Sequence, residues 1–203
     1  GCSANCVLNL VMDTCEVGGC LSAGYDHVCA LDNADAPVCW GFNTFGQTDP
    51  PPGLTLSSLA AGGVHTCGLQ SDGSAVCWGA NVHGQIDTPS GTFVSLCAGY
   101  SHNCGLTSSG QITCWGDNDH GQSTVPAGSF TKLACGDDHT CGVKSDGSTV
   151  CWGLNDDGQT PVAAGTFNAV DGGGFHSCGL QADGAIVCWG EDDDGQSTPP
   201  AGT

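Results

Sequence analysis

The chain has 203 residues with 34 Gly and 16 Cys, and its formal net charge of −19 comes from 21 acidic side chains against only two basic ones. Phosphate binding depends on clustered Lys and Arg, so this charge argues against nucleic acids and anionic membranes as partners. No apolar run approaches the roughly 20 residues that a membrane-spanning helix needs. The many cysteines are typical of an oxidising compartment, and we expect a secreted, extracellular protein without membrane insertion.

Residues 1–19 precede a repeated pattern and contain none of its recurring His, Trp or Gly-Gln positions. A segment of this size is too short to build its own core, so we expect a cysteine-rich cap that covers the first repeat. Four cysteines lie in this segment or at its junction with the repeats: Cys2, Cys6, Cys15 and Cys20. Their three possible pairings stay open at the level of sequence.

From residue 20 to 203 a single pattern recurs five times, and its clearest copy is VHTCGLQSDGSAVCWGANVHGQ at residues 64–85. Its Trp returns every 37 or 38 residues, at Trp40, Trp78, Trp115, Trp152 and Trp189. A fixed period of this length indicates an array of one supersecondary unit. Residues 20–203 therefore form a second, repetitive domain.

Within each copy two cysteines, ten residues apart, flank a turn signal such as Asp72-Gly73 and a stretch rich in β-branched residues. This pattern predicts a β-hairpin. A disulfide between facing strands needs the closer, non-hydrogen-bonded type of residue pair, and we predict one such disulfide per hairpin. The pairs are Cys29 with Cys39, Cys67 with Cys77, Cys104 with Cys114, Cys141 with Cys151, and Cys178 with Cys188.

Each repeat adds a short stretch before its hairpin and leaves through a Pro-containing linker, which predicts three short strands per repeat and no helix. The first repeat is irregular: Asn33-Ala34 replaces the Asp-Gly turn, and Pro37 lies in the second hairpin strand, where proline is tolerated mainly at an edge. Two further cysteines, Cys97 and Cys135, fall in repeats three and four. We expect an inter-repeat disulfide between them, with buried unpaired cysteines as the alternative.

The string A-G-x-x-H-T-C-G-L-x-x-D-G-x-x-x-C-W-G-x-N-x-x-G-Q, followed by x-x-V-P-A-G, resembles the repeat of the regulator of chromosome condensation family. It is most similar to the compact bacterial subgroup that includes a propeller-type β-lactamase inhibitor protein, with Cys where the family usually has a small residue. The resemblance implies an all-β propeller in which each repeat supplies most of a blade. Well-known members close a ring of seven blades. Five repeats leave open a closed five-bladed ring or an open arc completed by a neighbouring subunit.

The recurring histidines admit two interpretations. They could ring a channel and bind a metal, because imidazole is a common ligand, or each could hydrogen-bond the backbone at the turn into its hairpin. Recurrence in every copy favours the scaffold role. The Trp positions are expected in the blade core, and the Gly-Gln and Asn positions at turns. The histidines concerned are His27, His65, His102, His139 and His176.

The loops between Trp-Gly and Gly-Gln vary while their surroundings repeat, so binding function is expected there. Because their carboxylates lack EF-hand spacing, a solvated acidic surface is favoured and Ca²⁺ binding is the alternative, so no cofactor is expected. The candidate ligands are Asp117, Asp119, Asp156, Asp157, Glu191, Asp192, Asp193 and Asp194. Aromatic residues are the candidate contacts for a protein or glycan: Phe42, Phe45, Tyr100 and Phe175.

No catalytic constellation accompanies these features, because the serines lack a nucleophile-elbow context and the cysteines are assigned to disulfides. We therefore expect no enzyme. The leading hypothesis is a secreted structural or adhesive repeat protein that self-assembles into oligomers or filaments, because uncovered strand edges invite pairing with another chain. The alternative is an inhibitor-like or lectin-like module that binds protein or carbohydrate.

Overall fold

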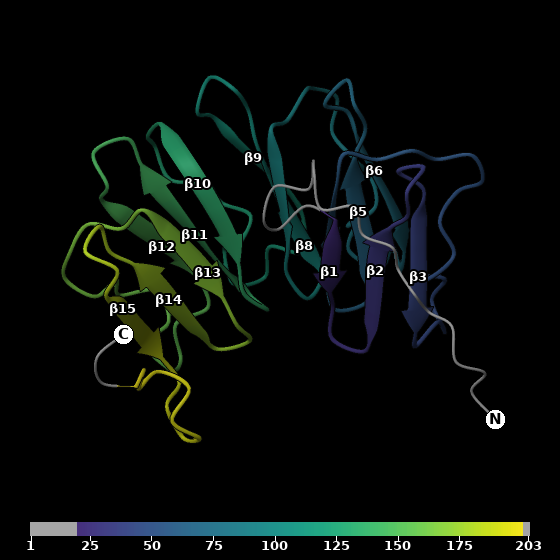
Figure 1. Ribbon diagram of the computed structural model, residues 1–203. Helices are drawn as coiled ribbons and strands as arrows, with labels where there is room; N and C mark the ends of the chain where they lie inside the picture. Colours follow the sequence, from purple (N-terminus) through teal and green to yellow (C-terminus); the bar gives the residue numbers. More distant parts are fainter. Residues whose placement is uncertain (1–19, 201–203) are drawn as a thin grey trace.

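A computed structural model describes residues 20–200 of the protein. Their strands form five antiparallel sheets of three strands each, one sheet per repeat, and each sheet keeps the sequence order of its strands (Figure 1). The all-β, propeller-type fold is thus confirmed. The predicted cap, with Cys2, Cys6 and Cys15, lies outside the described residues. The strands are β1 (Leu21–Ala23), β2 (His27–Leu31), β3 (Pro37–Gly41), β4 (Ser58–Ala61), β5 (His65–Leu69), β6 (Ala75–Gly79), β7 (Ser95–Ala98), β8 (His102–Leu106), β9 (Ile112–Gly116), β10 (Phe130–Cys135), β11 (His139–Lys144), β12 (Thr149–Gly153), β13 (Ala169–Gly172), β14 (His176–Leu180) and β15 (Ile186–Gly190).

The hairpin disulfides follow from the strand register. In the second blade Cys67 faces Cys77 directly, with their Cα atoms 4.1 Å apart. The backbone bond from Gln70 N–H to the Ser74 carbonyl and the alternation of an antiparallel ladder place this cysteine pair at a non-hydrogen-bonded position. All five predicted hairpin disulfides are present, at Cα separations of 4.0 to 4.1 Å.

The first blade accommodates its irregular sequence at the edge of its sheet. β3 is the outer strand, and Pro37 pairs with Leu31 at a non-hydrogen-bonded position, so its missing N–H removes no ladder bond. The left-handed turn residue is Asp35, with φ 58°, where the second blade uses Gly73, with φ 82°. Pro37 therefore lies in an edge strand of its sheet, where proline is tolerated.

Blades pack on one another in sequence order and form an open arc. Strands of different blades contact each other where the blades are consecutive, with β1, β4, β7, β10 and β13 on the inner side (Figure 1). In these interfaces Trp152 of the fourth blade packs against Phe130 of its own blade and Leu106 of the third. The ends are uncovered: Trp40 in the first blade is 48% exposed and Leu180 in the fifth is 42% exposed.

This arrangement corrects one expectation and decides between two others. Trp40 was predicted in the core, but it has no preceding blade among the described residues against which to pack, whereas Trp78 and Trp115 are buried. Of the two predicted closures, the structure shows the arc and not the five-bladed ring. Within residues 20–200 there is also no helix long and apolar enough to cross a membrane.

A sixth disulfide joins two blades. It links Cys97 in β7 to Cys135 in β10, so it fixes the third blade to the fourth at the inner strands. Cys20, beside β1, is also disulfide-bonded. The structure therefore contains disulfides both within hairpins and between neighbouring sheets.

We predict that replacing one hairpin disulfide, in the double variant Cys67→Ala/Cys77→Ala, lowers the free energy of unfolding by about 3 kcal/mol, because the unfolded chain regains the entropy of an open ten-residue loop. Urea unfolding measures the effect, and mass mapping of the unreduced wild-type protein verifies the pairing. An unchanged urea midpoint, or free thiols at these positions, would contradict the assignment.

Candidate functional site: the loop face

One face of the arc collects all the candidate binding residues. In each blade the turn between the first two strands and the loop after the third strand lie at the same end, because the start of the middle strand pairs with the end of the third, as His102 does with Gly116. We call this side the loop face. It comprises residues 24–26, 42–47, 62–64, 80–85, 99–101, 117–122, 136–138, 154–159, 173–175 and 191–196.

A glutamine holds each loop, and in the first four blades this glutamine is buried and connects its loop to the next blade. The Gln85 side-chain oxygen accepts the His83 backbone N–H at 2.8 Å. Its backbone carbonyl accepts two bonds from the third blade, from Trp115 Nε1 at 3.1 Å and Asn103 Nδ2 at 2.8 Å. The backbone carbonyls of Gln47 and Gln122 likewise each accept one bond from a Trp and one from a Thr of the next blade. The Gln159 carbonyl accepts one bond from a Trp. The Gly-Gln position is therefore an inter-blade joint as well as a turn.

The recurring histidines also connect successive blades. His65 Nε2 lies 2.7 Å from Asn103 Oδ1 in the next blade. Since the Asn103 amide already donates to Gln85, its oxygen accepts and the imidazole donates. The other such bonds are His27 to Thr66 at 2.8 Å, His102 to Thr140 at 2.9 Å and His139 to Ser177 at 2.7 Å. The predicted scaffold role holds, but the partner is a neighbouring side chain and not the turn backbone.

Burial determines the charge of these histidines. Desolvation lowers the pKa of His65, His102 and His139 to about 4, so each ring is neutral near pH 7. The fifth member, His176, is less buried and has no such partner side chain among the described residues. The four bonded rings each point at a single neighbouring blade, and therefore do not converge on a common metal centre.

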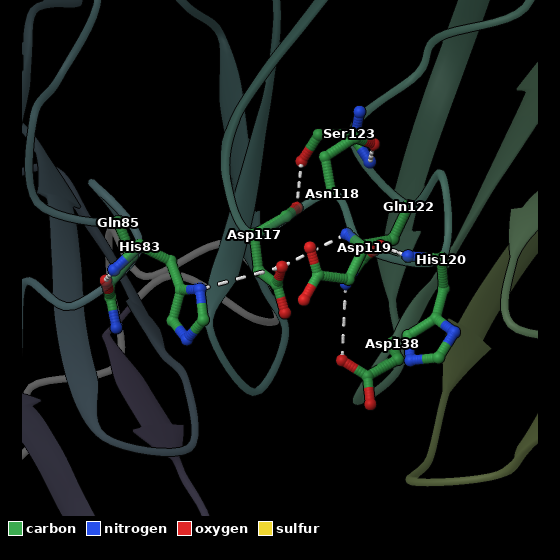
Figure 2. Close-up of polar contacts among 9 residues, drawn as sticks. All are labelled: His83, Gln85, Asp117, Asn118, Asp119, His120, Gln122, Ser123 and Asp138. Carbon is green, nitrogen blue, oxygen red and sulfur yellow. Dashed lines mark hydrogen bonds and ion pairs between the residues drawn. The ribbon is translucent and has the colours of Figure 1, made fainter.

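The remaining two histidines lie in the loops and face carboxylates of the following blade (Figure 2). His83 Nδ1 is 3.7 Å from Asp117 Oδ1. On the next blade, Asp138 accepts a 3.3 Å bond from Gln122, burial raises the pKa of Asp138, and the nearby His120 opposes that rise. These side chains form a polar rim along the loop face.

The acidic loop residues are spread along this rim and do not share a centre. Asp117 and Asp119 lie on the third blade, where the Asp119 N–H donates to Asp117 Oδ1 at 3.1 Å, and the other candidates lie on the fourth and fifth blades. Among residues 20–200, three or more metal-ligating atoms gather within 4.8 Å of one another at Cys97, Cys104 and Cys135, whose sulfurs are in disulfides. No comparable carboxylate cluster occurs in this part of the chain.

The structure pairs three of the four predicted aromatic contacts, one of them with a residue that sequence reasoning missed. Phe42 and Phe45 lie with ring centroids 6.3 Å apart. Tyr100 pairs with Tyr25, which was not predicted, at 5.9 Å. Both tyrosines directly follow the glycine after an inner strand, and this shared repeat position was the signal available in the sequence. Phe175 is 38% exposed on the fifth blade.

A concave groove of about 1200 Å³ runs along the inner side of the arc. It is lined by inner strands of all five blades, with small residues such as Ser22, Ala60 and Ala98, and with Lys132 and Asp171 as charged groups. The loop face lies at one end of these strands, because the inner turns follow directly from them. The protein therefore combines a polar and aromatic rim with a hollow beside it.

These features define a repeat propeller whose blades are joined by Trp–Gln and His–hydroxyl bonds. Residues 57–85, 93–122, 130–159 and 167–196 match the model of the Regulator of chromosome condensation (RCC1) repeat. The chain belongs to this family. No curated protein matches the chain at a significant level.

Solved structures place the chain beside plant receptor ectodomains. The ectodomain of the Physcomitrella patens receptor kinase CR4 is 33% identical over 84% of this chain and 49% of that one, with a TM-score of 0.71. The CRINKLY WD40 ectodomain of Arabidopsis thaliana ACR4 is 30% identical over 84% and 64%, with a TM-score of 0.70. Prp20p from Saccharomyces cerevisiae, at 21% identity and TM-score 0.75, shares the fold. The chain thus spans about half to two thirds of the length of these proteins.

The buried histidines predict a loss of stability in mild acid. Their ordinary pKa of 6.5 applies to the unfolded chain, which binds more protons than the folded chain as the pH falls from 6.5 toward 4. Stability is therefore complete above pH 6.5 and declines below it, by up to about 1.4 kcal/mol per pH unit for each histidine.

Urea unfolding between pH 6.5 and 5 measures this slope. Asp137 and Asp138, whose pKa burial raises, act in the opposite sense and are present in all the compared proteins. Replacing His102 by Gln should reduce the slope by about one proton. Replacing the exposed Val82 by Gln neither adds nor removes an ionisable group, so this variant is the control and should leave the slope unchanged. Equal slopes in all three proteins would contradict the prediction.

Proposed function

We propose that this protein is a secreted, non-catalytic structural or adhesive repeat protein whose two end blades pair head to tail between copies. The dense disulfides and the likeness to receptor-kinase ectodomains support an extracellular location. The proposal rests on one observation, the state of the two end faces of the arc.

Each end face exposes residues that are buried or packed at the internal interfaces. On the fifth blade Leu180 and Ile186 are 42% and 40% exposed. Their counterparts in the third blade, Leu106 and Ile112, pack against Trp152 of the next blade. On the first blade Trp40 is 48% exposed, although every later Trp of the repeat is buried. Among residues 20–200, an accepting face on the fifth blade and a donating face on the first blade are therefore both exposed.

Docking of the first blade of one copy on the fifth blade of another would extend the arc. Such a contact joins two different surfaces, so it generates rings or filaments. One residue makes this contact weaker than the internal ones. Val28 occupies the position of Thr66 and Asn103, so it offers no acceptor to His176. The charge of −19 also opposes association, and salt should strengthen assembly by screening it.

We predict that the apparent mass in sedimentation velocity rises with protein concentration and with salt. Val28→Thr supplies the missing hydroxyl and should tighten association roughly fivefold, which corresponds to one hydrogen bond of about 1 kcal/mol. Ile186→Asp places a charge on the accepting face and should abolish association. Val82→Asp, at a residue that is 79% exposed on a loop of the second blade, controls for added charge and should not abolish it. A monomer at every concentration, with Val28→Thr included, would contradict the proposal.

A second candidate function is the binding of a protein or carbohydrate at the loop face. It is supported by the gathering there of exposed aromatic and acidic side chains from different blades, and by the groove beside them. Aromatic residues enriched on an exposed surface are typical of contact sites.

A further inference from the structure

We propose that Tyr25 and Tyr100 form a site for a cationic side chain, Lys or Arg, carried by an extended segment of a partner protein. This assignment rests on the binding role of the loop face and adds the chemistry of the ligand. It is carried by three observations: the geometry of the two rings, the rigidity of the backbone beneath them, and the charge around them.

The two tyrosines come from the first and third blades and meet above the second. Their ring centroids are 5.9 Å apart at an interplanar angle of 83°, which forms a corner of two aromatic surfaces. Tyr25 is 69% exposed and Tyr100 is 40% exposed. The blade between them makes room because it has Gly63 at this place: a Cβ there would lie 2.4 Å from Tyr100 Cδ2. Space, and not a left-handed φ, therefore requires glycine at this position.

A belt of backbone hydrogen bonds fixes the turns that carry the rings. Tyr25 N–H donates to the Gly62 carbonyl at 3.4 Å, and Gly63 N–H donates to the Gly99 carbonyl at 3.1 Å. Tyr100 N–H in turn donates to the Asp137 carbonyl of the fourth blade at 2.9 Å. Each turn is thus tied to the next blade. The rings are held before any ligand arrives, so little conformational entropy is lost on binding.

The surroundings favour a positive ligand. The faces of aromatic rings attract cations electrostatically. Asp26 is next to Tyr25 in the same turn, and Asp137 and Asp138 occupy the equivalent turn of the fourth blade. The basic residues of the chain, Lys132 and Lys144, lie in β10 and β11, away from the loop face. At the loop face a basic segment therefore meets carboxylates and rings, and along the groove it meets both Lys132 and Asp171.

The groove gives such a segment a place to continue. Ala23 and Ala98, which line the groove, are one residue before the glycines that precede Tyr25 and Tyr100. A chain whose basic side chain rests on the two rings can follow the inner strands into the hollow. A partner with an extended, basic segment fits this combination of an acidic rim and a 1200 Å³ groove.

The test uses a fluorescent peptide of alternating Arg and Gly residues, compared with a Glu-Gly peptide of the same length, in anisotropy titrations at low salt. The Arg peptide should bind and the Glu peptide should not. Tyr25→Leu and Tyr100→Leu should each weaken binding roughly two- to fivefold, as expected for exposed cation–π contacts. Tyr100→Phe should retain it. Phe175→Leu, at an aromatic residue of similar exposure in the equivalent turn of the fifth blade, is the matched control and should bind like the wild type.

Gly63→Ala provides a second variant that leaves both tyrosines in the sequence. Its methyl group should displace the Tyr100 ring and reduce Arg-peptide affinity to the level of Tyr100→Leu, while an unchanged urea midpoint shows that the blade remains folded. Equal affinity in all variants would show that net charge alone attracts the peptide, and would overturn the site.

A glycan control separates this proposal from the broader binding role. If cellohexaose binds in a Tyr100-dependent manner and the Arg peptide does not, the loop face is a binding surface but the cationic assignment is wrong. If neither probe binds, both the assignment and the binding role of this face fail. Assembly through the end blades is measured separately and is unaffected by either result.

Discussion

The structure depends on the bonds that cross from one blade to the next. A sheet of three short strands has too little core to be stable alone, so each blade must bury its surface against a neighbour. The buried polar groups in that interface must then be paired. The Trp side chain satisfies the glutamine carbonyl of the preceding blade, and the histidine satisfies the hydroxyl or amide of the following one. One interface thus combines an apolar contact with a fixed set of hydrogen bonds.

This dependence separates the residues that repeat from those that vary. Gln85 and His65 are buried, and each is required by contacts that recur at every internal joint. The residues at the positions of His83 and Asp117 differ from blade to blade on the loop face, where His83 is exposed and Asp117 is partly buried. Chemistry that distinguishes this chain from another propeller is therefore located in its loops and inner turns. The same amino acid, histidine, serves as neutral scaffold in the interface and as a polar surface group at the rim.

Much of the fold was predictable because local rules determine it. Two cysteines ten residues apart around a turn can face each other across only one hairpin register, and the period of the Trp positions gives the number of blades. The partner of His65 was not predictable, since it depends on how closely consecutive blades approach. The exposure of Trp40 was missed for a related reason. The Cys-Trp-Gly motif around Trp40 is the same as in the other repeats, but burial of this Trp requires a preceding blade, which the motif does not report.

The candidate site was predictable in part. Variable loops indicated the face on which exposed aromatic and acidic side chains gather, and three of the four predicted aromatic residues have an aromatic neighbour there. The pairing of Tyr25 with Tyr100 depends on Gly63, which lies in the blade between them and leaves room for the Tyr100 ring. A contact that spans three repeats in this way is not described by any local sequence pattern. The acidic loops showed the opposite case. Their composition allowed a solvated surface or a Ca²⁺ site, and among residues 20–200 the carboxylates do not gather at one centre. Each of the loops is fixed to its own glutamine.

The inter-blade bonds also give the arc a direction, and this restricts how two copies can meet. At the internal joints the accepting face offers the Gln carbonyl and an imidazole N–H, whereas the donating face offers the indole N–H and a hydroxyl or amide, which Val28 replaces on the first blade. Two accepting faces placed together would oppose carbonyl to carbonyl, and two donating faces would leave both indoles without an acceptor. A two-fold symmetric dimer through the blade ends would therefore bury unpaired groups, at about 1–3 kcal/mol for each. Only a contact between unlike ends reproduces the pattern of the internal joints, which is why the geometry of a single blade interface favours extension of the array over closed pairing.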